Sequence, residues 1–324
     1  MELRPIDSCN VVVLVDNVTD ILSTTPSSVT GHTSNVLKAG AKEISGKCLC
    51  CAHFGLSLVI TVQQETTNHT LLFDSGPEGV TVERNGRRLG IDFASIKAAM
   101  FSHGHWDHVG GMTTGLQLIY DANGGIKIPV HVNDEMFVRR GTRTPRGKII
   151  PFENVPSKAE LEEVGGSIVS VAEEHTLLED TFYISGEIPR TTAYEKGLAG
   201  HVKIIGEGWE PDPLIMDERY AAIHIKDKGI MVFTACSHAG VINVLKNAQY
   251  VFDPIPIYGV MGGFHLSGEE CEAIIPETIE DMKLFDLKVI VPGHCTGWRA
   301  AHKLVEAFSE ETVIMSAVGN THRF

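Results

Sequence analysis

A short histidine-rich segment constrains this chain more than any other part of it. The segment reads FSHGHWDHVGGM at residues 101–112 and places His103, His105, Asp107 and His108 within six positions. Imidazole nitrogens and a carboxylate oxygen are ligands that suit zinc and iron. A histidine-rich surface loop is the alternative interpretation, but four such residues in six positions favour a metal site. His103 and His105 are two residues apart, so at a strand end they can point the same way and bind one ion, while Asp107 and His108 face a neighbouring point.

Other candidate ligands share one sequence context, in which an apolar run ends in a histidine or aspartate close to a glycine. The residues in this position are Asp74, His103, His238, His265 and His294. Taken singly, each of the last three could equally be a structural histidine. Strand ends at one edge of a sheet converge in space, and glycine lets the backbone turn sharply there. Together these residues therefore predict one shared site.

Composition describes an ordinary globular protein and argues against one class of partner. Hydrophobic residues make up 43% and charged residues 21% of the 324 residues, which suffices for a full core. The 41 acidic and 27 basic residues give a formal charge of −14, which disfavours binding to a nucleic-acid backbone. No apolar run approaches the roughly 20 residues of a membrane span. We therefore expect a cytoplasmic protein with a small-molecule substrate and neither nucleic acid nor membrane as partner; a homodimer is left open.

The seven cysteines are odd in number and scattered, so reduced thiols are expected and a disulfide framework is not. Cys48, Cys50 and Cys51 could hold a structural metal, although no second cysteine-rich segment could complete such a site. No linker or repeat marks a boundary. We expect one domain over residues 1–324, with loop insertions at about 18–46 and 139–217.

Local patterns predict the elements around the metal loop. Strands are expected at residues 11–15, 56–62 and 70–73, a turn in the glycine-containing basic stretch 84–90, and a helix at 92–100. The basic run RRGTRTPRGK at 139–148 is either a solvated loop or a clamp for an anionic substrate.

Four further motifs carry a family resemblance: SGEIPR at 185–190, ACSHAG at 235–240, GGFHL at 262–266 and PGHCTG at 292–297. With the H-x-H-x-D-H loop, they make the chain resemble the metallo-β-lactamase superfamily from about residue 10 to 310. The branch they resemble includes a dihydropterin–ribofuranosylaminobenzene phosphate synthase of a pterin pathway. The resemblance implies an α/β fold, a four-layer αβ/βα sandwich of two mixed sheets with helices outside and metal at their shared edge.

The resemblance also implies two ligand sets, for one or two Zn²⁺ ions, with iron or manganese as alternatives. The first set would be His103, His105 and His238, and the second Asp107, His108 and His294. Many relatives have a bridging aspartate where this chain has Cys236, so the second ion is expected to bind more weakly unless the thiol ionises and becomes a ligand.

Roles for the remaining residues follow from their expected places around the ion. Asp74 is expected to orient a ligand imidazole. Asp107 would hold the attacking water and accept its proton, and His265 would protonate the leaving group or bind substrate. An alternative makes His265 the third ligand in place of His238. The residues expected near the pocket are an ion pair between Glu187 and Arg190, and the wall residues Trp106 and His53, for which purely structural roles are equally open.

The expected function is that of a metal-dependent hydrolase. A metal-bound hydroxide would attack an ester, lactone, amide or activated carbon–halogen bond of a small aromatic or heterocyclic molecule. A pterin-pathway synthase that joins a dihydropterin to an aminobenzene is one alternative. A non-catalytic, metal-bound sensor is another, which an open, water-bearing metal loop disfavours.

Overall fold

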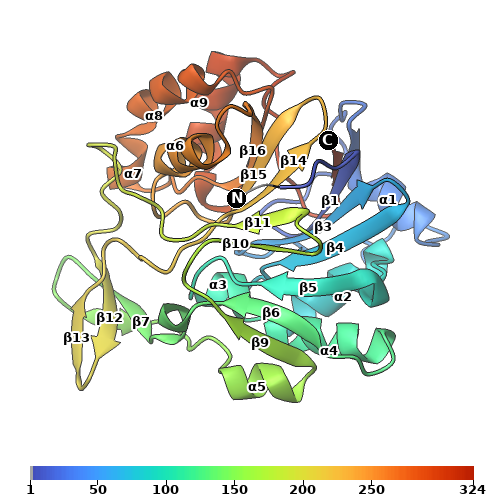
Figure 1. Ribbon diagram of the computed structural model, residues 1–324, viewed down its shortest axis with the longest axis horizontal. Coiled ribbons are helices and arrows are strands. Elements are labelled where there is room, and N and C mark those ends of the chain that lie inside the picture. Colours follow the sequence, from blue (N-terminus) through green and yellow to red (C-terminus); the bar gives the residue numbers. More distant parts are fainter. Residues whose placement is uncertain (1–2) are drawn as a thin grey trace.

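Two large β-sheets face each other in the computed structural model, which describes residues 3–324, and helices cover their outer faces (Figure 1). The first sheet has eight strands in the order β2-β18-β1-β3-β4-β5-β6-β9. Its strands are β1 (Ser8–Val15), β2 (Val29–Thr30), β3 (Ser57–Gln64), β4 (Thr67–Phe73), β5 (Ile96–Met100), β6 (Ile128–Val132), β9 (Gly166–Ser170) and β18 (Thr321–Arg323).

The second sheet has six strands in the order β10-β11-β14-β15-β16-β17. They are β10 (His175–Leu177), β11 (Phe182–Ile184), β14 (Ala221–Ile225), β15 (Gly229–Thr234), β16 (Ile257–Gly263) and β17 (Val289–Gly293). Both sheets are mixed. Strands β4, β5, β6 and β9 run parallel to one another in the first sheet, and so do β15, β16 and β17 in the second.

Three apolar layers separate the four layers of secondary structure. In β4, Leu71 and Phe73 face the second sheet while Leu72 faces the helices, because successive side chains of a strand point to opposite sides. The helices beside the first sheet are α2 (Gly79–Leu89), α4 (Met112–Ala122) and α5 (Lys158–Glu163), and those beside the second are α6 (Val241–Phe252), α8 (Ile275–Met282) and α9 (Trp298–Phe308). The expected four-layer αβ/βα sandwich is confirmed.

The two expected insertions differ in content. Residues 18–46 contain only β2 and the short helix α1 (His32–Lys38). Residues 139–217, expected as a loop insertion, contain strands of all three sheets. Part of this segment forms a small third sheet that extends from the body near the first sheet (Figure 1), in the order β13-β12-β7-β8, from β7 (Arg140–Arg143), β8 (Ile149–Pro151), β12 (His201–Ile205) and β13 (Gly208–Pro211).

Two local predictions are wrong. The expected turn at 84–90 lies inside α2, and the expected helix at 92–100 is a short 3-10 turn followed by β5. None of the helices within residues 3–324 has the length and apolar character needed to cross a membrane.

His322 makes the fold sensitive to acid. This β18 residue is fully buried, its two ring nitrogens have no hydrogen-bond partner within residues 3–324, and burial lowers its pKa to about 4. Its pKa in the folded state therefore lies below the unfolded value of about 6.5. A histidine that must stay neutral when folded favours unfolding as the pH falls through 6.5 toward 4. At about pH 4, this one residue should lower the free energy of unfolding by on the order of 3 kcal/mol.

We expect His322→Phe to lose less stability than the parent protein between pH 7 and pH 4. The comparison is urea unfolding of the two metal-free proteins at both pH values. The exposed His302 on α9 provides the control, because His302→Gln should leave the pH dependence unchanged. Parallel curves for the parent and His322→Phe would show that this histidine does not set the acid sensitivity.

Candidate metal centre

The first ligand set meets at the end of β5. His103 follows this strand, His105 precedes the short helix α3 (Trp106–Val109), and His238 follows β15 in the other sheet. The Nε2 atom of His103 lies 3.0 Å from Nδ1 of His105 and 3.2 Å from Nε2 of His238. All three imidazoles are buried. The glycine between the two loop histidines is required, because a Cβ atom on Gly104 would lie 2.0 Å from the carbonyl oxygen of Met136.

The second ligand set lies beside the first. Asp107 and His108 belong to α3, and His294 follows β17. The Oδ2 atom of Asp107 is 3.4 Å from Nε2 of His294 and 3.6 Å from Nε2 of His108. Ligand atoms within each set lie within 4.8 Å of one another. The structure thus brings together all six residues expected as ligands.

These donors fit a metal ion. Two nitrogens bound tetrahedrally to one ion at about 2.0–2.1 Å lie roughly 3.3 Å apart, close to the spacing in the first set. Burial, and then the neighbouring imidazoles, hold the pKa of His103 and His238 well below the ordinary value, so both rings are neutral and have a free lone pair. In the second set, the buried Nε2 of His294 makes no hydrogen bond within residues 3–324.

Asp74, directly after β4, orients a histidine of each set. Its Oδ2 accepts from Nδ1 of His108 at 2.8 Å and from the hydroxyl of Ser102 at 2.6 Å. That hydroxyl lies 2.8 Å from Nδ1 of His103. Because the carboxylate can only accept, Nδ1 of His108 carries the proton and Nε2 keeps its lone pair.

We expect Asp74→Asn to weaken metal binding by roughly 10- to 100-fold, since outer partners of ligand histidines have effects of that size. Isothermal titration of the metal-free variant with zinc measures the change, and circular dichroism checks that it is folded. Asp121→Asn, on the exposed side of α4, is the matched control. Unchanged affinity in Asp74→Asn would refute the orienting role.

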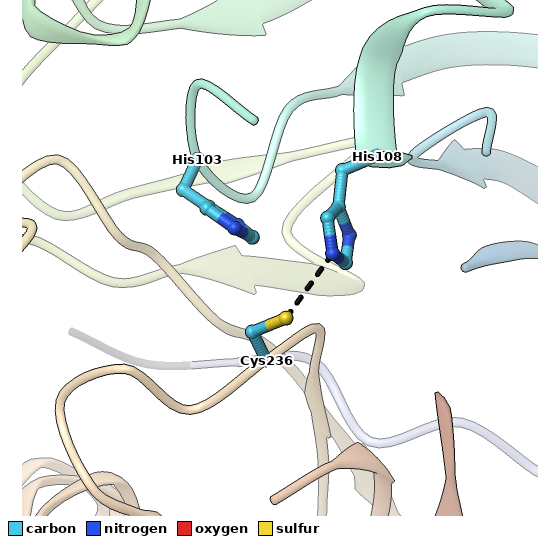
Figure 2. Close-up of side chains that lie close together, drawn as sticks. All are labelled: His103, His108 and Cys236. Atoms are coloured by element: carbon cyan, nitrogen blue, oxygen red, sulfur yellow. Dashed lines mark hydrogen bonds between the residues drawn. The ribbon is translucent and has the colours of Figure 1, made fainter. Parts of the chain in front are cut away.

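Cys236 lies between the two ligand sets. Its thiol donates to Nε2 of His108 at 3.2 Å, and the ligand atoms of Cys236, His103 and His108 lie within 4.8 Å of one another (Figure 2). Its sulfur also lies 3.4 Å from that of Cys295, a residue that the sequence interpretation passed over. The available signal was its position, directly after His294 in PGHCTG.

His201 was also missed. It begins β12 of the third sheet, and its Nε2 lies 2.8 Å from Nε2 of His105, on the side of the ring away from His103. No motif surrounds it in the sequence. Its place depends on a sheet that the sequence did not reveal.

Several expected pocket residues lie elsewhere or make other contacts. Trp106 lines the cavity at the metal centre, whereas His53 is partly exposed, 3.6 Å from Glu78. Glu187 is exposed, and Arg190 donates to the carbonyl oxygen of Leu214 at 2.6 Å. No ion pair joins Glu187 and Arg190 in the described part of the chain.

Glu218, which the sequence interpretation did not single out, contacts the backbone directly after β15. Its carboxylate accepts from the backbone N–H groups of His238 and Ala239, both at 2.7 Å. Arg140, from the basic run, is neither solvated nor open to an anion. It is buried and paired with Asp212 and Asp217.

Two adjoining cavities give access to the centre. One of about 250 Å³ lies over both ligand sets and has the apolar wall residues Phe54, Trp106, Phe152 and Leu198. The other, of about 380 Å³, shares Leu198, His238 and His265 with it and extends to Tyr194 and Phe264. His265 therefore lies where the two cavities meet, with its ring centroid 4.6 Å from that of His238.

Comparison with known proteins agrees with the observed fold. The model of the metallo-β-lactamase superfamily matches residues 53–193. A solved metal-dependent hydrolase of the β-lactamase superfamily superposes with a TM-score of 0.68, at 21% identity, over 97% of this chain and 98% of the other. The chain has the metallo-β-lactamase fold. Unliganded yeast PDE1 shares it more distantly, with a TM-score of 0.54 at 9% identity over 98% of this chain and 100% of that one.

Sequence relatives agree with the expected branch. The 7,8-dihydropterin-6-methyl-4-(β-D-ribofuranosyl)-aminobenzene-5′-phosphate synthase of Methanocaldococcus jannaschii is 28% identical over 259 residues, covering 79% of this chain and 85% of the relative. An uncharacterised protein of the same organism is 29% identical over 78% of this chain and 88% of the relative. The resemblance to the superfamily and to this branch is confirmed.

Proposed function

We propose that this metallo-β-lactamase fold protein is a metal-dependent hydrolase that uses water to cleave an ester, lactone, amide or activated carbon–halogen bond of a small aromatic or heterocyclic molecule. The observation that carries the proposal is the pair of buried ligand sets at the floor of a cavity with aromatic walls. His103, His105 and His238 would hold the first ion, and Asp107, His108 and His294 the second. A divalent ion held there lowers the pKa of water toward about 7 and polarises the bond to be broken.

Asp107 is placed to direct the water. Burial alone would raise the pKa of its carboxyl, but His108 and His294 lower that pKa by a larger amount. The pKa therefore falls below the usual value, and the group stays ionised. An ionised Oδ2 can accept a hydrogen bond from water and fix the direction of attack. Because its pKa is low, Asp107 passes a proton on and does not retain it.

His265 is the candidate proton donor. Burial opposes its charged form, but the neighbouring Cys295 raises its pKa above the ordinary value. Its Nδ1 has no hydrogen-bond partner in the described chain and is free to give a proton to a leaving group. Phe54, whose ring centroid lies 5.0 Å from that of His294, and Trp106 would form an apolar wall beside the substrate.

The size and lining of the cavities support the substrate class. The smaller cavity has apolar, partly aromatic walls above a polar floor of candidate ligands, which suits a flat ring with one reactive polar bond. Nothing in them resembles the extended basic surface that a nucleic-acid substrate needs.

A second candidate function is supported by the 28% identical synthase relative. On that alternative the same centre would activate one of two organic substrates in place of water, and would join a dihydropterin to an aminobenzene. The larger cavity beside His265 could then hold the second ring.

Metal analysis followed by a substrate screen tests both candidates. We expect between one and two zinc, iron or manganese ions per chain after gentle purification. The screen compares lactones, aryl esters and haloaromatics with pterin precursors given together with an aminobenzene. Turnover of a single substrate with water supports the hydrolase, and turnover that needs both partners supports the synthase. Well under one ion per chain with activity intact would exclude a metal-dependent mechanism. A metal-loaded protein that binds these compounds without turnover would indicate a sensor.

A further inference from the structure

Two buried thiols lie together at the metal centre. Cys236 follows β15 and Cys295 follows β17, and their sulfur atoms are 3.4 Å apart with no disulfide between them. Both residues line the cavity above the ligand sets, with 2% and 7% of their surfaces exposed. Cys9, which is also buried, instead packs in the apolar layer between the sheets. The thiol pair is therefore placed among polar groups and not used as apolar filling.

The thiol pair has the geometry of a ligand set. The sulfur atoms of Cys236 and Cys295 and a ring nitrogen of His294 all lie within 4.8 Å of one another. Sulfurs bound to one zinc at about 2.3 Å in a tetrahedral arrangement are roughly 3.8 Å apart, so a small movement would suffice. The backbone leaves room for the sulfur of Cys295, because a Cβ atom on Gly263 would lie 2.6 Å from it.

This set shares His294 with the second ligand set, so one ion near His294 has two kinds of partner. One kind is the carboxylate of Asp107 with the imidazole of His108, and the other kind is the two sulfurs. Thiolates favour zinc, cadmium and other soft ions, whereas carboxylates suit manganese and magnesium. Many relatives have a bridging aspartate where this chain has Cys236. Two thiolates would supply negative charge close to the two cations in place of that carboxylate.

We propose that Cys236 and Cys295, together with His294, ligate the second ion and make that position selective for thiophilic metals. The proposal rests on the metal centre of the proposed function, but not on which reaction it catalyses. A thiol that is still protonated loses its proton to solvent when the ion binds, because the thiolate is the ligand.

Cobalt titration of the reduced, metal-free protein tests the proposal. We expect the second equivalent to produce the near-ultraviolet absorption of thiolate-bound cobalt. Cys295→Ser should remove a large part of that absorption and weaken the second equivalent by at least tenfold, while the first equivalent binds as before. Cys48→Ser, which changes a thiol outside the centre, should leave the whole titration unchanged. For manganese, the second equivalent should bind more weakly than cobalt and be indifferent to Cys295→Ser.

A measurement on the unmodified chain covers the case in which a variant does not fold. Alkylation followed by peptide mass spectrometry should show that the second zinc equivalent protects Cys236 and Cys295 together, while Cys48 stays reactive. Absence of the thiolate absorption, or equal alkylation of both thiols with and without the second ion, would overturn the proposal. Sulfur ligation without turnover of any substrate would leave it standing and would count against the hydrolase alone.

Discussion

Replacing His105 with alanine is expected to remove the first ion and to lower kcat/KM by roughly a thousandfold, while the protein remains folded. The ring joins two partners, with Nδ1 turned to His103 and Nε2 to His201. Without it, two nitrogens remain for the first ion, and several kcal/mol of transition-state stabilisation are lost with that ion. The helix that follows should survive, because the side chain of His105 makes no capping hydrogen bond to α3.

Metal content and steady-state rates of His105→Ala, with circular dichroism for the fold, check this expectation. His302→Ala on the exposed face of α9 is the matched control and should retain both metal and rate. Normal turnover by His105→Ala with a full complement of metal would reject the first ligand set.

The sequence allows the candidate ligands to be placed together where they follow parallel strands. His103, His238 and His294 each come after a strand that pairs with a parallel neighbour, and the carboxyl ends of such strands share one edge. A short apolar run with a histidine and a glycine at its end is visible without knowledge of the fold. The layer order followed from the family resemblance and not from these runs.

Local patterns failed where packing decides the conformation. Gly86 indicated a turn, but it lies within α2 because its missing side chain makes room for Phe93, whose ring would lie 2.4 Å from a Cβ atom there. The alanine-rich stretch in β5 has helical propensity. It forms a strand because it fills the gap between β4 and β6, with parallel pairing on both sides.

The position of His201 and the pairing of Cys295 with Cys236 could not be predicted from sequence for a different reason. The position of His201 depends on the third sheet, whose strands are short and separated by up to some sixty residues of chain. The thiol pair is visible only when Cys295 is placed beside Cys236, which is 59 residues away in sequence. Pairings of that range are set by tertiary structure, and one sequence carries no local sign of them.

A buried charge network fixes the third sheet to the metal loop. We expect Asp217→Ala, which removes one carboxylate of this network, to destabilise the metal-free protein by about 3–5 kcal/mol. Arg140 of β7 donates to Asp217 at 2.7 Å and to Asp212 at 3.2 Å, and all three are buried. Asp217 also accepts from the N–H of Gly104, between the two loop histidines, at 2.8 Å. Its removal leaves a buried guanidinium with one carboxylate fewer and frees the loop backbone.

Urea unfolding of the metal-free proteins measures the loss, and zinc titration should show weaker first-set binding in the same variant. The matched control is Glu280→Gln, which breaks the exposed pair with Lys283 and should cost under about 1 kcal/mol. Burial raises the pKa of Asp217 although Arg140 lowers it, so desolvation of the carboxylate opposes the attraction within the pair. Replacing both partners, as in Arg140→Met with Asp217→Leu, should therefore restore part of the stability that Asp217→Ala loses. The double variant could instead lose at least as much free energy of unfolding as the two single variants together. That result would show that the network stabilises the fold by itself and that the unpaired charge is not the cause of the loss.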